Sequence, residues 1–283
     1  MLVTVFLPPQ PAKHADGKTY RENVRRNLDE SEIFVEMKLL KRVLLGLLVA
    51  AILLTVGFVI WAETPLGPAP EALAALQSDS QVTVDQSDGF ITFTPTDQSP
   101  TTGFIFYPGG RVDARSYAAP LREIAARGYL VILAPVRLNL AFFDINAAAP
   151  VFDAHPEIQH WAVGGHSLGG VAAALFAKEY PQIEGLVFWA SYPADESLKD
   201  STIRVLSIYG TNDMAGAGAF AEKDALMPTS VEYVVIEGGN HAQFGDYGFQ
   251  PGDNEATISR ADQQAQTVDA VVQFLTSLES SPR

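Results

Sequence analysis

The sequence predicts an α/β fold with a mostly parallel central sheet and helices on both faces. Short apolar or β-branched runs alternate with helical patterns from residue 103 to residue 278, which favours parallel strands joined by crossover helices. The 283 residues suffice for one large domain with an appendage. Residues 191–201 separate two expected strands and are too few for an inserted lid, so we expect no lid domain.

The expected elements follow in chain order. A hairpin is predicted where apolar and polar residues alternate on either side of a Ser-Asp-Gly turn, at residues 81–85 and 90–95. Further strands are expected at residues 103–107, 129–135, 162–165, 185–190, 204–210 and 231–236. Helices are expected at residues 114–127, 168–179, 217–226 and 261–278, and a helix with loops at residues 139–152.

Composition narrows the classes of function. The net charge is −14, and residues 63–283 carry 11 Lys and Arg against 27 Asp and Glu. Because so acidic a domain repels phosphate backbones, we expect no nucleic-acid partner. The absence of cysteine excludes disulfides and thiolate chemistry. Five scattered histidines argue against a metal site, and no motif indicates a cofactor or an oligomeric state.

Residues 43–62 form an uncharged apolar run that predicts a membrane-spanning helix. Twenty helical residues extend about 30 Å, the thickness of a bilayer core. Lys38, Lys41 and Arg42 precede the run, so the positive-inside rule places the following chain outside the cytoplasm. The length of the run and the lack of a clear cleavage site favour a retained anchor. The alternative is a cleaved signal peptide and a secreted protein.

The sequence therefore divides into four expected parts. They are an N-terminal extension at residues 1–36, a membrane segment at 37–62, a linker at 63–80 and an α/β domain at 81–283. Prolines in the linker predict a stiff spacer that lifts the domain off the membrane.

A serine motif lies at the centre of the expected domain. Gly165-His166-Ser167-Leu168-Gly169 joins a buried strand to an Ala-rich helix. So sharp a turn exposes the serine hydroxyl, and a Cβ at either outer glycine would collide across it. Ser167 is therefore the candidate nucleophile, and the alternative is an ordinary residue at a helix N-terminus.

An alcohol is a weak nucleophile at neutral pH, so Ser167 needs a histidine base oriented by a carboxylate. Such groups are expected at the carboxyl ends of parallel strands. Asp213 follows the strand at 204–210, and His241 follows the strand at 231–236. Taken singly, Asp213 has an alternative role as a helix cap, and His241 as a polar loop residue. Three other acidic residues are alternatives to Asp213 as the orienting acid, but they fit the strand ends less well: Asp195, Glu196 and Glu237.

A tetrahedral intermediate needs two N–H donors for its oxyanion. The expected donors are Leu168, directly after the serine, and Gly110, in a glycine-rich loop after the strand at 103–107. Arg111 beside this loop is a candidate for binding a substrate carboxylate, with a solvated surface position as the alternative. Apolar candidates for pocket walls, with core packing as the alternative for at least half, are Leu138, Leu140, Phe142, Phe143, Tyr192 and Phe244.

From about residue 103 to residue 278 the chain resembles serine hydrolases of the α/β-hydrolase superfamily, close in motif to the dienelactone-hydrolase-like and small-esterase branch. The matching stretches are Tyr107-Pro108-Gly109-Gly110, Gly128-Tyr129-Leu130-Val131, Gly165-His166-Ser167-Leu168-Gly169-Gly170, Gly210-Thr211-Asn212-Asp213 and Gly239-Asn240-His241. The resemblance implies Ser167 as nucleophile, His241 as base and Asp213 as orienting acid, with Gly110 and Leu168 as oxyanion donors.

The chain departs from these relatives at two positions. Pro108 stands where many members have histidine before the oxyanion glycine, a choice also seen in polyester-hydrolase-like relatives. Dienelactone hydrolases proper use cysteine where this chain has Ser167, so their substrate does not carry over.

These features together predict a membrane-tethered carboxylesterase-like enzyme that cleaves small to medium acyl esters through a Ser-His-Asp triad. A second interpretation keeps the triad and changes the bond to a lactone, amide or polyester. A third is a non-catalytic, membrane-anchored binding module on a hydrolase scaffold. An intact triad argues against the third, because drift without selection would have damaged a member.

Met37 begins a conventional targeting sequence, with basic residues followed by the apolar run. We therefore expect residues 1–36 to arise from an over-extended start. A peptide map of the native protein should then contain no peptide upstream of Met37, and the detection of one would contradict this expectation.

Overall fold

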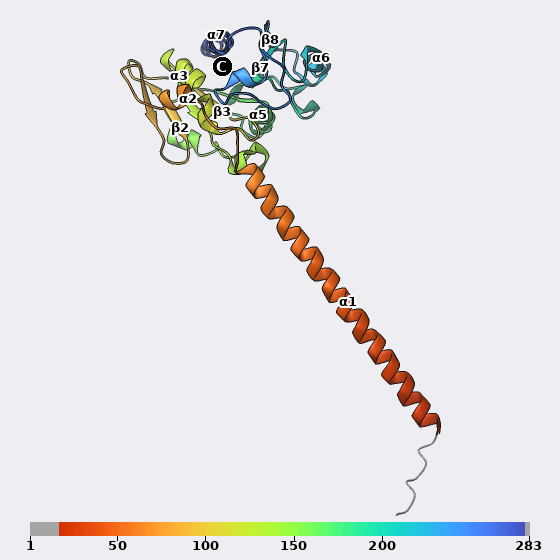
Figure 1. Ribbon diagram of the computed structural model, residues 1–283. Helices are drawn as coiled ribbons and strands as arrows, with labels where there is room; N and C mark the ends of the chain where they lie inside the picture. Colours follow the sequence, from red (N-terminus) through yellow and green to blue (C-terminus); the bar gives the residue numbers. More distant parts are fainter. Residues whose placement is uncertain (1–16, 281–283) are drawn as a thin grey trace, which may run out of the picture. The chain divides into compact units, whose positions relative to one another are not determined.

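The computed structural model describes residues 17–280 (Figure 1). The chain divides into a first unit that ends at Phe58 and a second that begins at Val59. Helix α1 (Gly17–Ala62) contains the expected membrane segment and also continues upstream of it, so residues 17–36 do not form a separate element. Residues 1–16 of the expected extension lie outside the described residues.

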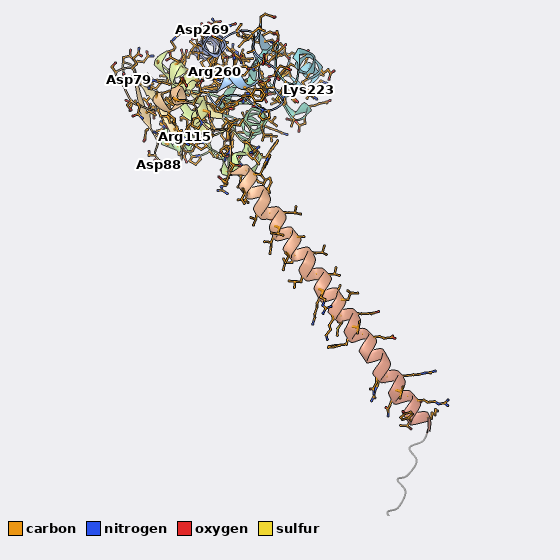
Figure 2. All side chains as sticks on the ribbon, viewed as in Figure 1. Asp79, Asp88, Arg115, Lys223, Arg260 and Asp269 are labelled. Atoms are coloured by element: carbon orange, nitrogen blue, oxygen red, sulfur yellow. The ribbon has the colours of Figure 1, made fainter. Side chains whose placement is uncertain are left out.

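Helix α1 has the properties of a membrane span by length and composition. Its most apolar 18-residue window has a mean hydropathy of 3.0 and buries none of its residues. The described side chains of α1 are exposed as far as Trp61, and they project from the ribbon in Figure 2. A signal sequence near an N-terminus has the same composition. Helix α1 is therefore a candidate for either role.

The second unit is built on one eight-stranded sheet. Its strands are β1 (Val82–Asp85), β2 (Ile91–Pro95), β3 (Thr102–Tyr107), β4 (Leu130–Leu133), β5 (His160–His166), β6 (Ile183–Trp189), β7 (Arg204–Gly210) and β8 (Val231–Ile236). The strand order is β1-β2-β4-β3-β5-β6-β7-β8. Strand β2 pairs antiparallel with β1 and β4, and all other neighbours are parallel. The predicted hairpin and the mostly parallel sheet are confirmed.

Helices cover both faces of the sheet. They are α2 (Pro70–Ala74), α3 (Ala118–Ala126), α4 (Val151–Ala154), α5 (Leu168–Glu179), α6 (Ala217–Glu222) and α7 (Arg260–Glu279). Along β3, Phe104 and Phe106 belong to the core that contains residues of α3 and α7, while Ile105 and Tyr107 belong to the core that contains α5. Successive strand side chains point to opposite faces, so a strand with every residue buried has a helical layer on each side.

The segment at residues 139–152 differs from the expected helix with loops. It contains the short 3₁₀ turn Ala141–Phe143 and the single helical turn of α4, and another 3₁₀ turn, Arg137–Asn139, leads into it. Leu138 and Asn139 have φ values of 56° and 51°. A right-handed helix cannot continue through residues in the left-handed region, so the apolar composition forms a series of tight turns instead.

Residues 63–80 do not form the expected spacer, because they pack on the second unit. The N–H of Leu66 donates to the carbonyl of Arg111 at 2.8 Å, and the carbonyl of Leu66 accepts from Asp113 at 2.9 Å. Ala72 in α2 is fully buried, and Leu76 is nearly so. Proline content predicts local stiffness but not tertiary contacts. Residues 63–80 are therefore part of the second unit.

Candidate active site

The turn after β5 holds Ser167 in a strained backbone conformation. Its φ is 51° and its ψ is −120°, values that residues other than glycine seldom adopt. The N–H of Ser167 donates to Trp189 at 2.9 Å, and its carbonyl accepts the hydroxyl of Ser191 at 2.6 Å. A Cβ at Gly165 would overlap the backbone of Gly169. The predicted sharp turn at Ser167, called the elbow below, is therefore present at the carboxyl end of β5.

Asp213 and His241 lie beyond the carboxyl ends of β7 and β8 and contact each other. Nδ1 of His241 is 2.8 Å from Oδ2 of Asp213, and both side chains are buried. Because Nδ1 binds the carboxylate, Nε2 is the nitrogen left to exchange a proton. This Nε2 is buried and has no hydrogen-bond partner in the described part of the chain. The ring of His166, next to Ser167, lies 4.4 Å from the His241 ring, measured between centroids.

Two features position the loop that carries His241. A Cβ at Gly210, the last residue of β7, would overlap the carbonyl of Gly239, so glycine allows the β7 and β8 loops to approach. The carboxylate of Asp253 accepts the N–H groups of His241 at 3.3 Å and of Ala242 at 2.8 Å. The sequence indicated no role for Asp253, because this residue lies in no motif and contacts the backbone N–H of His241.

Gly110 and Leu168, the two expected oxyanion donors, lie against each other. A Cβ on Gly110 would approach the Leu168 side chain to 2.9 Å. Leu168 is the first residue of α5, so its N–H has no acceptor within the helix. Within the described residues neither N–H donates a hydrogen bond. The positive end of α5 lies at the same place, so the arrangement suits an oxyanion beside Ser167.

Tyr117 connects the loop that carries Gly109 and Gly110, called the oxyanion loop below, to the elbow. Its hydroxyl accepts the N–H of Gly109 at 3.1 Å and is hydrogen-bonded to Nδ1 of His166 at 2.8 Å. Burial, and then the neighbouring His241, lower the pKa of His166 well below its ordinary value. Burial also raises the pKa of Tyr117. Both groups are therefore neutral. The sequence indicated no role for Tyr117, since one tyrosine in a helical pattern is not a motif.

Arg111 does not take the expected position for a substrate carboxylate. Its Nε donates to the carbonyl of Trp61 and its Nη2 to the carbonyl of Thr64, each at 2.9 Å. Its guanidinium lies 4.3 Å from the centre of the Trp61 ring. The last carbonyls of a helix lack donors and carry partial negative charge. The cation therefore binds the end of α1, which local sequence could not reveal.

The aromatic candidates for pocket walls divide into three kinds of position. Phe244 is fully buried, and its ring lies 5.7 Å from that of His166, so it packs in the core instead of forming an open wall. Tyr192 is half-buried and packs against both cores. Phe142 and Phe143 are 49% and 54% exposed.

The groups around Ser167 suit proton transfer and oxyanion binding. A hydroxyl on a strained turn, a histidine with one nitrogen held by a carboxylate, and two N–H groups are the parts that acyl transfer requires. Among the described residues, no group of three or more His, Cys, Asp or Glu side chains could hold a metal ion.

Comparisons with known proteins agree with this fold. A family model described as "Alpha/beta hydrolase family" matches residues 103–265. No curated protein matches the chain. The esterase domain of a Rhodothermus marinus protein has a similar structure, with a TM-score of 0.51 at 14% identity, covering 69% of this chain and 96% of its own. Est1E from Butyrivibrio proteoclasticus has a TM-score of 0.48 at 15% identity, and the match covers 71% of this chain and 100% of Est1E. At such identities the likeness concerns the fold.

Gly169→Ala is expected to destabilise the elbow, because its Cβ would overlap the backbone carbonyls of Tyr107 and Pro108. We expect the free energy of unfolding to fall by about 1–3 kcal/mol, measured by urea denaturation in detergent. Gly67→Ala is the matched control, since nothing lies within 4 Å of its Cβ, and its effect should stay below about 0.5 kcal/mol. Equal losses in the two variants would contradict the packing at the elbow.

His166 should make stability depend on pH. The folded state keeps His166 neutral, because its pKa lies well below 6.5, whereas the unfolded chain takes up the proton near 6.5. The unfolded state therefore binds more protons as the pH falls, and His166 should lower the free energy of unfolding by about 1.4 kcal/mol per pH unit below that value. Urea denaturation between about pH 7.5 and 5.5 should show a shallower slope for His166→Asn. Parallel slopes would refute this assignment.

Proposed function

The chain belongs to the alpha/beta hydrolase family, and on this premise we propose that it is a serine hydrolase that cleaves carboxylic esters of small to medium acyl groups. The observation that carries the proposal is the 2.8 Å His241–Asp213 pair, whose histidine ring packs on the residue before Ser167. This pair supplies an oriented base near Ser167, which a binding module does not need.

The proposed reaction begins when Nε2 of His241 takes the Ser167 proton as the hydroxyl oxygen attacks the acyl carbonyl. Asp213 holds the imidazole tautomer and stabilises its cation. The N–H groups of Gly110 and Leu168 bind the oxyanion. The intermediate then collapses, the alcohol leaves with the proton from His241, and an acyl group remains on Ser167. Water activated by the same imidazole releases the acid.

Two observations support the preference for esters. Between β6 and β7 the chain forms only the 3₁₀ turn Glu196–Leu198 and adjoining loops, so no lid domain is inserted there. Access to Ser167 therefore requires no displacement of a lid domain. The Rhodothermus marinus domain of similar fold is described as an esterase domain. Lactones, amides and polyesters react through the same steps and are the alternative substrates.

We also propose that α1 is retained as an anchor, with the hydrolase unit outside the cytoplasm. Support comes from the uncharged apolar run at residues 43–62 and from Lys38, Lys41 and Arg42 before it. The carbonyls of Trp61 and Thr64 bind Arg111 of the folded unit, a contact that retention of α1 preserves.

Ser167→Ala is expected to abolish hydrolysis by the full chain in detergent. Turnover of p-nitrophenyl esters of increasing chain length should fall by at least about 10³-fold for every ester, because no other nucleophile is held at the elbow. Ser87→Ala, at an exposed position in the β1–β2 turn, is the matched control and should keep wild-type rates.

Labelling with a fluorophosphonate separates the remaining outcomes. If wild type is labelled at Ser167 but cleaves no ester, the nucleophile is correct and the bond class is wrong. If wild type neither cleaves an ester nor takes the label, the chain is a non-catalytic module and the proposed function is refuted.

A further inference from the structure

The end of α1 is bound by the loops next to the candidate active site. Ala62, the last residue of the apolar run, is fully buried, and its carbonyl accepts Nδ2 of Asn139 at 3.1 Å. The carbonyls of Trp61 and Thr64 are bound by Arg111. The point where the chain leaves the proposed membrane segment is therefore held against the folded unit without a flexible spacer.

These contacts continue directly to the oxyanion loop. The N–H of Arg111 donates to the carbonyl of Asn139 at 2.7 Å, and Leu66 pairs with the backbone on both sides of Val112. Arg111 follows Gly110, where an added Cβ would contact the side chains of Leu168 and Leu140. Arg111 alone thus links Gly110, the candidate oxyanion glycine, to the end of the apolar run.

The same loop carries two exposed aromatic side chains. Phe142 and Phe143 follow Asn139 closely and stand on the turn Ala141–Phe143, whose first residue is fully buried. The side chain of Arg137, before the turn, is 79% exposed, and its Nε lies 3.6 Å from Oδ2 of Asp144. Two exposed phenylalanine side chains suit a membrane-interface contact, because such apolar side chains are buried at the boundary between headgroups and acyl chains.

We propose that the turn at residues 137–143 rests on the bilayer that α1 spans, and that Ser167 therefore acts on amphiphilic esters taken from that bilayer. The proposal rests on the proposed anchor and esterase activity, and it names the source of the substrate. The partner is the lipid surface because Asn139, within this turn, binds the carbonyl of Ala62, the residue at which the proposed membrane segment ends. Tethering also concentrates the site at the surface.

Site-directed labelling tests the contact in the full chain. The protein contains no cysteine, so Phe142→Cys gives a single site for a spin label in vesicles of phosphatidylcholine and phosphatidylglycerol. Val235→Cys is the matched control, because the exposed fraction of Val235, 48%, is close to that of Phe142. Val235 lies on the edge strand β8, which is four strands and about 19 Å from β3 across the sheet.

We expect the label at Phe142 to collide more with oxygen, which concentrates in lipid, than with a water-soluble nickel chelate. The label at Val235 should show the reverse. A label at Phe142 that is as open to the chelate as the control overturns the proposal. So does protection of that label from both reagents, which indicates cover by protein such as a second copy. Failure of the wild-type chain to float with the vesicles overturns the anchor on which the proposal rests.

Hydrolysis of an ester embedded in vesicles, compared with hydrolysis of a soluble ester, tests the source of the substrate. Phe142→Glu should lower hydrolysis of a long-chain p-nitrophenyl ester embedded in the vesicles by about 10-fold more than hydrolysis of soluble p-nitrophenyl acetate. An unchanged ratio overturns the proposal while leaving the esterase activity intact. If wild type cleaves neither ester although the label lies in lipid, the proposed function fails, and the membrane contact alone stands.

Discussion

A steric constraint at the turn after β5 underlies the whole site. Gly165 and Gly169 pack so closely that a Cβ on Gly165 would overlap the backbone of Gly169, and a Cβ on Gly169 would overlap the carbonyls that follow β3. This contact holds Ser167 at φ 51°, which an isolated turn would not sustain. The same contact fixes the start of α5 against the oxyanion loop. One packing arrangement therefore positions the candidate nucleophile and the candidate oxyanion donors.

The oxyanion loop is held from two sides by different physical interactions. On one side, Tyr117 accepts the N–H of Gly109 and binds His166, a neutral pair that burial prevents from ionising. On the other side, Arg111 binds the carbonyls at the end of α1. Hydrogen-bond donors fixed before the reaction stabilise a developing charge without reorganising. A loop braced at both ends meets that requirement, and it connects the proposed chemistry to the proposed membrane segment.

The candidate site was largely predictable because its residues lie in short local motifs. Ser167, Asp213 and His241 each follow an apolar strand in the sequence, and parallel strands bring their carboxyl ends to one edge of the sheet. Supporting residues were not predictable. Tyr117 lies 49 positions from His166 and Asp253 lies 12 positions from His241, and neither residue belongs to a catalytic motif.

The sequence by itself determined the strands, the parallel pairing and the places of Ser167, Asp213 and His241 after strand ends, because side-chain periodicity and turn chemistry act over a few residues. Only the tertiary structure decided the role of residues 63–80, which pack on the domain through Leu66 instead of separating it from the membrane. It also placed Phe244 in the core and Arg111 on the end of α1. The sequence indicates which interactions a side chain is able to form. Which partner it meets depends on contacts between segments far apart in the chain, such as the 50 positions between Trp61 and Arg111.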